Sequence, residues 1–366
     1  MSRKMKKKWL ATIGLSPILT VAVCLVGCSS SGSTGTTSNA AATVAYTHAA
    51  YLNSGLEQIV GYSAAPGNGS AVVSSFTQTP PKYLTGPIAT DQTGQVYSSL
   101  LSASSNSIEI DVYPPYPTGV TGPSRSIQIQ MPPESVVFGL AVDSAGLLYV
   151  AYNTWPYPVV PTVAVYSAAA SGAATPIRTM QPSAAQPEIE ATDMALDADG
   201  NIYIAGYATI SETTKAYVWV YPPTASGLSM PSRTINAGGN GLAASGVAVA
   251  PAGDVFVNVW GGVVHYIEEF APGAEGAATP VNTMYTSVET PGYSMVYCGP
   301  VRLDGAGNIF TSFEVFADPD NLGAPAPSAW FIYGYEPTAT GSQAPSVQIA
   351  PLTRYPLGDG AYFALH

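Results

Sequence analysis

The sequence predicts an all-β fold, specifically a six-bladed β-propeller of four-stranded blades. One turn-containing motif recurs six times at nearly constant spacing, and a second motif of a strand and a turn alternates with it. Glycine (36 residues) and proline (32 residues) are abundant in a chain that is 46% hydrophobic, which is typical of many short strands joined by turns. A fixed period of this size indicates a repeat architecture, and four strands in each repeat indicate propeller blades.

The first motif is predicted to be a β-hairpin, with a glycine in its turn and an aromatic residue three positions later. Its copies read GPIATDQTGQVYSS, GLAVDSAGLLYVAY, DMALDADGNIYIAG, GVAVAPAGDVFVNV and GPVRLDGAGNIFTS, with YPLGDGAYFALH as a weaker sixth copy. The turn glycines lie 52, 54, 53, 54 and 53 residues apart, at Gly94, Gly146, Gly200, Gly253, Gly307 and Gly360. Four turns open with an aspartate: Asp91, Asp143, Asp197 and Asp304. A carboxylate there can accept backbone N–H bonds, so a turn explains these aspartates better than a metal site.

The second motif is a short strand that ends in an aromatic residue and a turn, as in DVYPP and WVYPP. A further strand follows most copies, which brings each unit to four strands. The array begins with the second motif and finishes with the first. We therefore expect the last two strands of the chain to complete the blade that the first two begin, so that N-terminal and C-terminal strands share one blade. Such closure pairs strands that would otherwise be open edges.

The N-terminus reads as a targeting segment. Residues 1–27 combine a basic start with an apolar stretch, as in a secretory signal. The stretch ends in LVGC, which resembles the bacterial lipobox, and the resemblance implies a lipoprotein signal peptide followed by lipidation of Cys28. Residues 28–42 would then be the lipidated cysteine and a flexible Ser/Gly/Thr tether, and residues 43–366 the propeller domain. This predicts a protein of the bacterial cell envelope, outside the cytoplasm, held on a membrane by its lipid.

Charge argues against nucleic acid as a partner. The net charge of −11 becomes −16 once the five basic residues of the leader are removed. Phosphate binding needs clustered Lys and Arg, which the remaining chain lacks. After processing, Cys298 is left without a cysteine for an intramolecular disulfide and without a histidine near it in sequence, so we expect a buried, inert thiol. We expect a monomer.

Units such as AVDSAGLLYVA and ALDADGNIYIAG resemble those of NHL-repeat and related six-bladed propellers. The resemblance covers about residues 43 to 366 and implies the ring fold. It does not select one activity, because propellers of this kind include scaffolds, lactonase-like hydrolases and lyases.

Aromatic residues in equivalent loops suggest a ligand-binding face. Trp155, Tyr157 and Trp260 could stack on a sugar or bind a protein partner, or they could cover the edge of the core. Arg302 stands where other copies have alanine, and is a fourth candidate for this face. It could bind an anion at the channel or pair with a carboxylate such as Asp193, and we favour the pair, because a buried guanidinium needs an acceptor.

No standard catalytic motif is present in the sequence, which has no G-x-S-x-G, H-E-x-x-H or P-loop pattern. The leading hypothesis is therefore a binding module for a protein or glycan, with no cofactor. The first alternative is a lactonase-like, metal-dependent hydrolase or lyase at the mouth of the central channel, holding Ca²⁺ or Zn²⁺ through Asp193, Asn153, Asn258 and Glu314. The second alternative is a structural role in envelope assembly.

Overall fold

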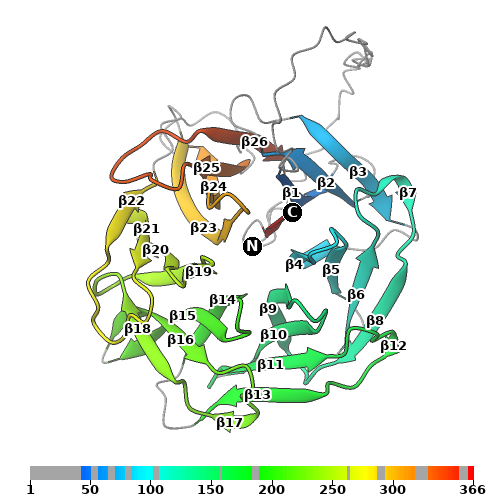
Figure 1. Cartoon of the computed structure of the whole chain (residues 1–366), viewed down its shortest axis with the longest axis horizontal. Coiled ribbons are helices and arrows are strands. Elements are labelled where there is room, and N and C mark those ends of the chain that lie inside the picture. Colours follow the sequence, from blue (N-terminus) through cyan, green and yellow to red (C-terminus); the bar gives the residue numbers. More distant parts are fainter. Residues whose placement is uncertain are drawn as a thin grey trace, which may run out of the picture. The chain divides into compact units, whose positions relative to one another are not determined.

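The computed structural model describes residues 43–50, 57–64, 71–78, 84–101, 107–156, 158–183, 189–210, 212–261, 264–286, 293–317, 329–353 and 362–366. Its strands form six sheets arranged around a central axis (Figure 1), which confirms the predicted six-bladed β-propeller. Within these ranges, no helix has the length and apolarity needed to span a bilayer.

Each blade contains four antiparallel strands, which follow one another from the channel outward. Blade 1 contains β27 (Phe363–Leu365), β1 (Val44–Ala50), β2 (Glu57–Ser63) and β3 (Val72–Gln78). Blade 2 contains β4 (Leu84–Thr90), β5 (Val96–Leu101), β6 (Ser107–Tyr113) and β8 (Arg125–Gln130). Blade 3 contains β9 (Ser135–Val142), β10 (Leu148–Thr154), β11 (Val160–Tyr166) and β13 (Arg178–Pro182). Blade 4 contains β14 (Glu190–Leu196), β15 (Ile202–Ile210), β16 (Thr213–Tyr221) and β18 (Arg233–Ala237). Blade 5 contains β19 (Ala243–Val249), β20 (Val255–Gly261), β21 (Val264–Phe270) and β22 (Asn282–Tyr285). Blade 6 contains β23 (Tyr293–Leu303), β24 (Ile309–Ala317), β25 (Ala329–Tyr335) and β26 (Val347–Thr353).

Three short strands connect neighbouring blades at the outer edge. These are β7 (Thr118–Thr121), β12 (Gly172–Ala173) and β17 (Gly227–Ser229). Each belongs to the connection before the outer strand of one blade and pairs in parallel with the outer strand of the preceding blade. The unpaired N–H and C=O groups of an outer strand would otherwise attract another chain. The added strands therefore cover these edges and join the blades.

The hairpin turns form as predicted in the five copies that the structure describes. Their glycines, from Gly94 to Gly307, have φ between 78° and 95°, the region that favours glycine. Asp143 Oδ1 accepts the N–H groups of Ala145 and Leu147 at 2.9 and 2.8 Å. Asp91, Asp197 and Asp304 do the same in their own turns. The turn aspartates therefore have the structural role that the sequence favoured.

A Tyr–Arg pair strengthens three of these turns. In blade 3, the Tyr149 hydroxyl donates to Asp143 Oδ2 at 3.3 Å, and Arg178 donates to the Tyr149 oxygen at 3.0 Å. Blades 2 and 4 repeat the arrangement with Tyr97–Arg125 and Tyr203–Arg233. Arg233 also donates to the Ala274 carbonyl of the next blade at 2.6 Å, so the arginine links blades as well as supporting its turn.

The two ends of the chain share blade 1, but the predicted division into two strands from each end is wrong. Three strands come from the N-terminal side, and β27 alone comes from the C-terminal side. β27 takes the inner position, and β1 is its return strand, with Tyr46 opposite Ala364. β27 and β1 thus form a hairpin whose strands are not joined by a turn, because they end and begin the chain's propeller. At that position Val44 and His366 exchange backbone hydrogen bonds at 2.8 and 3.0 Å. Val44, Ala45 and Tyr46 of β1 are buried, which explains why this segment fills the blade. Gly360 lies outside the described residues.

Candidate functional site

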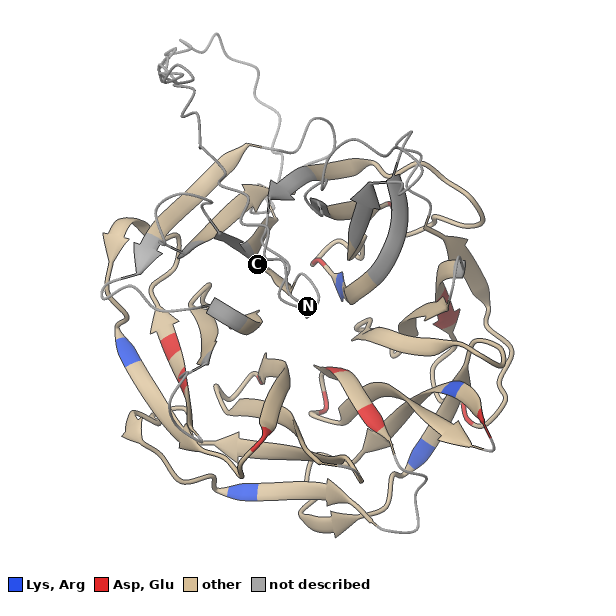
Figure 2. Ribbon diagram, turned by 180° about the vertical axis from the view of Figure 1, so that it is seen from behind, with Lys and Arg blue, Asp and Glu red and all other residues tan. Residues whose placement is uncertain are grey.

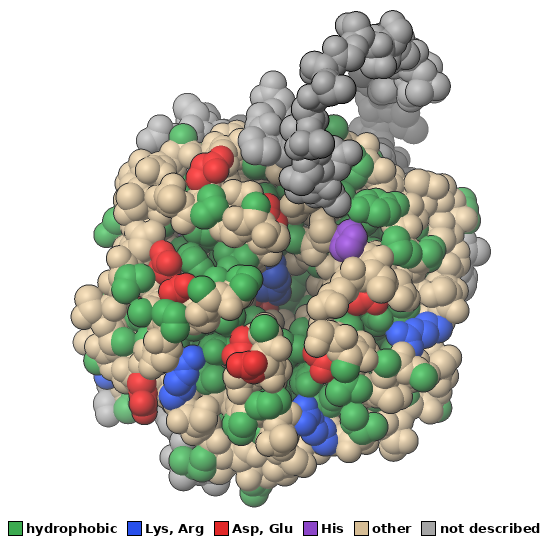
Figure 3. All heavy atoms as spheres, in the orientation of Figure 1, with side chains coloured by type: hydrophobic (Ala, Val, Ile, Leu, Met, Phe, Trp, Pro, Cys, Tyr) green, Lys and Arg blue, Asp and Glu red, His purple; other side chains and the backbone are tan. Residues whose placement is uncertain are grey.

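Two cavities lie along the channel that the six inner strands surround. The later residues of these strands line a central cavity of about 240 Å³, at positions 88–90, 140–142, 194–196, 247–249, 302–303 and 364–365. Figure 3 shows a hollow at the centre of the ring, walled largely by hydrophobic side chains. Its described lining residues are apolar except for Thr90 and Arg302. This cavity therefore offers a ligand few polar side chains.

A second cavity, of about 280 Å³, lies at the opposite end of the same strands. We call it the aromatic pocket, because its lining includes Phe138, Trp155, Trp260 and Tyr362, together with Asn153 and Glu190. On β14, Thr192 lines the aromatic pocket and Met194 lines the central cavity, so the two cavities follow each other along the strand. Ligand sites commonly combine aromatic walls with a few placed polar groups in this way.

The two tryptophans reach the aromatic pocket from separate blades. Trp155 directly follows β10 of blade 3 and is 36% exposed. Trp260 lies near the end of β20 in blade 5, opposite His265 of β21, and is half-buried. Both positions come at the end of the second strand of a hairpin, which is why the repeat pattern placed them in equivalent loops. The structure places both on one cavity.

Asn153 contributes an unpaired hydrogen-bond acceptor. It lies on β10 and is 6% exposed, and its Nδ2 donates to the Ala191 carbonyl of the next blade at 2.7 Å. Its buried Oδ1 has no hydrogen-bond partner among the described residues. A buried acceptor left unpaired costs about 1–3 kcal/mol, so this oxygen favours a ligand that carries a donor.

Glu190 supplies a carboxylate to the same pocket. It begins β14, directly opposite Tyr207 on β15, and is half-buried. Burial raises the pKa of Tyr207, and the hydrogen bond that its hydroxyl donates to Glu190 raises that pKa further. The tyrosine therefore stays protonated and holds the Glu190 side chain at the pocket.

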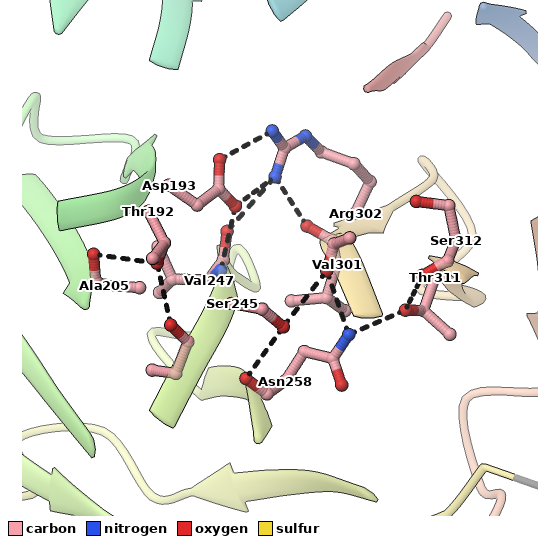
Figure 4. A network of polar contacts seen from close by, with 12 residues as sticks. Thr192, Asp193, Ala205, Ser245, Val247, Asn258, Val301, Arg302, Thr311 and Ser312 are labelled. Atoms are coloured by element: carbon pink, nitrogen blue, oxygen red, sulfur yellow. Dashed lines mark hydrogen bonds and ion pairs between the residues drawn. The ribbon is translucent and has the colours of Figure 1, made fainter. Parts of the chain in front are cut away.

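Asp193 and Arg302 form an ion pair at the level between the two cavities (Figure 4). Arg302 donates to Asp193 Oδ2 at 2.7 Å and to Oδ1 at 2.9 Å, and the Val247 N–H donates to Oδ2 at 3.0 Å. The Asp193 side chain is 1% exposed, whereas that of Arg302 is 20% exposed. The pair therefore bridges β14 and β23 across β19, as the sequence favoured, and Arg302 faces the central cavity, not the aromatic pocket.

Glycine allows the close spacing of strands beside this pair. A Cβ at Gly246 of β19 would lie 2.5 Å from the Val301 nitrogen and 2.8 Å from the Pro300 Cα of β23. Such distances are too short for any side chain, so glycine is required where the inner strands converge.

The residues proposed as metal ligands take part in different contacts. Asp193 is held by Arg302, while Asn258 Nδ2 donates to the Gly299 carbonyl at 3.0 Å and to Thr311 Oγ1 at 2.9 Å. Asn153 lines the aromatic pocket. Glu314 lies on β24, and its side chain is outside the described set. Among the side chains that the structure describes, no group of three or more His, Cys, Asp and Glu gathers in a metal-binding cluster.

A Cys–His contact is one feature that the sequence did not predict. Cys298 Sγ lies 3.0 Å from His265 Nδ1, although the two residues are 33 positions apart, because β21 and β23 belong to neighbouring blades. Both are buried, as predicted for Cys298. Burial raises the pKa of the Cys298 thiol and lowers the pKa of His265, so both groups are neutral near pH 7. A protonated thiol is a poor nucleophile.

Two predicted sites fall outside the described residues. These are Cys28, the predicted lipid attachment point, and Tyr157 of the candidate aromatic face. Both remain sequence-based predictions.

No protein-family model matches the chain, so the NHL resemblance remains an expectation from sequence. No curated protein matches it either. Among solved structures, a protein of unknown function from Bacteroides caccae is similar, with a TM-score of 0.53 and 10% identity over 89% of this chain and 99% of that one. A periplasmic gluconolactonase from Pseudomonas aeruginosa has a TM-score of 0.46 and 12% identity over 88% of this chain and 99% of its own. The first similarity shows the fold, and neither bears on activity.

Proposed function

We propose that this protein is a lipid-anchored, extracytoplasmic binding module whose aromatic pocket takes a terminal sugar of a glycan. The observation that carries the proposal is that Trp155 and Trp260, 105 positions apart, line one cavity. Indole faces stack on the apolar faces of sugar rings, and a buried polar atom such as Asn153 Oδ1 fixes ligand orientation.

The size of the pocket favours a glycan end over a protein surface. At about 280 Å³ it lies near the lower limit of the ~300–1,000 Å³ that small-molecule sites occupy. One sugar ring is a better match for such a volume than a folded partner, which binds over a wide area.

The test is a glycan-binding screen on the purified full chain and on a Trp155→Ala/Trp260→Ala variant. We expect the double variant to bind its glycan at least tenfold more weakly, a loss of about 1.4 kcal/mol or more. Tyr285→Ala is the matched control, because Tyr285 is 49% exposed on the outer strand of blade 5, away from the pocket. Unchanged binding in the double variant would reject the proposal.

A metal-dependent hydrolase is the second candidate. The observation in its favour is that Asn153 and Asn258 each keep a buried amide oxygen that has no hydrogen-bond partner in the described part of the chain. A metal held also by Asp193 would have to replace Arg302, which now occupies that carboxylate. Stoichiometric Ca²⁺ or Zn²⁺ in the purified protein, lost in Glu314→Ala, would support this candidate. Metal-free protein with no thermal shift on adding either ion would reject it.

A further inference from the structure

The described wall of the aromatic pocket contains an acidic side chain and no basic one. Glu190 is an ionisable carboxylate at the pocket, and no Lys or Arg is among its described lining residues. The described basic residues lie mostly on outer parts of the blades (Figure 2). Arg302, the exception, faces the other cavity and is held by Asp193. An anionic ligand would therefore meet repulsion at this pocket and no opposing charge.

Two hydroxyl donors in the wall, those of Thr192 and Ser245, are already used within the protein. Thr192 donates to the Ala244 carbonyl at 2.8 Å, and Ser245 lies 3.4 Å from the Gly299 carbonyl. Among the buried side-chain atoms of the described wall residues, the one without a partner is an acceptor, Asn153 Oδ1; the amide nitrogen of the same side chain donates to the Ala191 carbonyl. A ligand that contributes N–H or O–H groups would complete the hydrogen bonding of this wall.

We propose that the ligand presents a protonated amine to the aromatic pocket, as the terminal 2-amino sugar of a glycan would. This inference rests on the proposed function and specifies its ligand class. A protonated amine satisfies three features together: it donates to Asn153 Oδ1, it is attracted by the Glu190 carboxylate, and it is attracted to the faces of Trp155 and Trp260. A neutral sugar satisfies only the stacking and the hydrogen bond.

A divalent metal fits these groups less well than an ammonium does. Ca²⁺ takes six to eight oxygen ligands, whereas the described side chains of the pocket supply one carboxylate, from Glu190, one amide oxygen, from Asn153, and hydroxyls, of which those of Thr192 and Ser245 are already bonded within the protein. An ammonium needs about three acceptors and tolerates aromatic neighbours.

The experiment measures binding of glucosamine, N-acetylglucosamine and glucose to the full chain by titration calorimetry, below the pKa of the glucosamine amine. N-acetylglucosamine carries the same nitrogen as an uncharged amide, so it isolates the effect of charge. We expect glucosamine to bind at least tenfold more tightly than either neutral sugar. Glu190→Gln should remove this preference, because glutamine carries no charge but retains an acceptor for the Tyr207 hydroxyl.

Glu336→Gln is the matched control, since Glu336 is an exposed acidic residue in a turn of blade 6. The Glu336→Gln variant should prefer glucosamine as strongly as the unmodified protein does. Equal binding of the three sugars, still weakened in the Trp155→Ala/Trp260→Ala variant, would overturn the amine inference and leave the proposed function standing. A preference that survives in Glu190→Gln, binding of Ca²⁺ alone that Glu190→Gln abolishes, or no binding of any of the three sugars would also overturn it.

Discussion

Replacing Arg302 with alanine tests how the channel wall is held together. Alanine is the residue that four other blades carry at this position (Ala89, Ala141, Ala195 and Ala248), so the change introduces no steric conflict. It leaves the Asp193 carboxylate, 1% exposed, with the Val247 N–H and without a counter-charge. Removing one partner of a buried pair typically costs about 3–5 kcal/mol, and we expect that loss in the free energy of unfolding.

Replacing the partner, Asp193, should lower the free energy of unfolding by a smaller amount. Asp193→Ala leaves Arg302 unpaired, but its side chain is 20% exposed to the central cavity and keeps a hydrogen bond to the Val301 carbonyl at 2.8 Å. We expect a loss of about 1–3 kcal/mol. In the double variant both charges are gone, so its loss should be smaller than that of Arg302→Ala.

The assay is urea unfolding of the four proteins, followed by tryptophan fluorescence. The double-mutant cycle gives the coupling between the two side chains directly. We expect a coupling well above 1 kcal/mol, with Arg302→Ala the least stable of the four proteins. Additive losses, with a coupling below about 0.5 kcal/mol, would refute the view that this pair stabilises the contact between blades 4 and 6 across blade 5.

Four further predictions concern the blade contacts, the two residues of the buried Cys–His contact and the anchor. Arg233→Ala should lower the free energy of unfolding by about 1–2 kcal/mol, because it removes hydrogen bonds to Tyr203 and Ala274. Urea unfolding measures this change, and an unchanged stability would contradict the role of Arg233 in linking blades. The folded protein should not react with a thiol reagent at Cys298 near neutral pH and should react after unfolding, since burial raises the pKa of that thiol. Because burial lowers the pKa of His265, the unfolded chain takes up a proton below about pH 6.5 that the folded protein does not. The free energy of unfolding should therefore fall as the pH drops from about 6.5 to the pKa of His265 in the folded protein, by up to about 1.4 kcal/mol per pH unit, and His265→Gln should remove that slope. Glu268 on the same strand has a raised pKa and acts in the opposite direction. The measurement is therefore the difference in stability between the unmodified protein and His265→Gln at each pH. Cys28→Ala should leave an unprocessed precursor that takes up no radiolabelled fatty acid, and labelling that persists would show that Cys28 is not the lipid attachment point.

The fold could be predicted from the sequence because the hairpin repeat is dictated locally. Each Asp-x-x-Gly turn is fixed by its own residues, as the hydrogen bonds of Asp143 show, and the period of the repeat then counts the blades. The strand division of the closing blade was predicted wrongly because β27 pairs with a strand at the other end of the sequence. The sequence pattern placed Phe363 to Leu365 in the second strand of a hairpin, whereas this segment is the inner strand of the blade.

The candidate site was predicted in part. Trp155 and Trp260 occupy equivalent places in their blades, and a ring brings equivalent places around one channel. Asp193 and Arg302 both broke the repeat pattern, which pointed to their pairing. Cys298 and His265 gave no such signal, because their contact joins different strands of neighbouring blades. The role of Glu190 was also missed, since it depends on how blade 4 faces the pocket.

The most direct test of the account is a crystal structure of the protein with glucosamine bound. We predict that the sugar ring lies in the aromatic pocket against Trp155 and Trp260, with its amine at Asn153 Oδ1 and Glu190. Sugar bound in the central cavity or at the outer edge of the ring, with the aromatic pocket empty, would contradict the account.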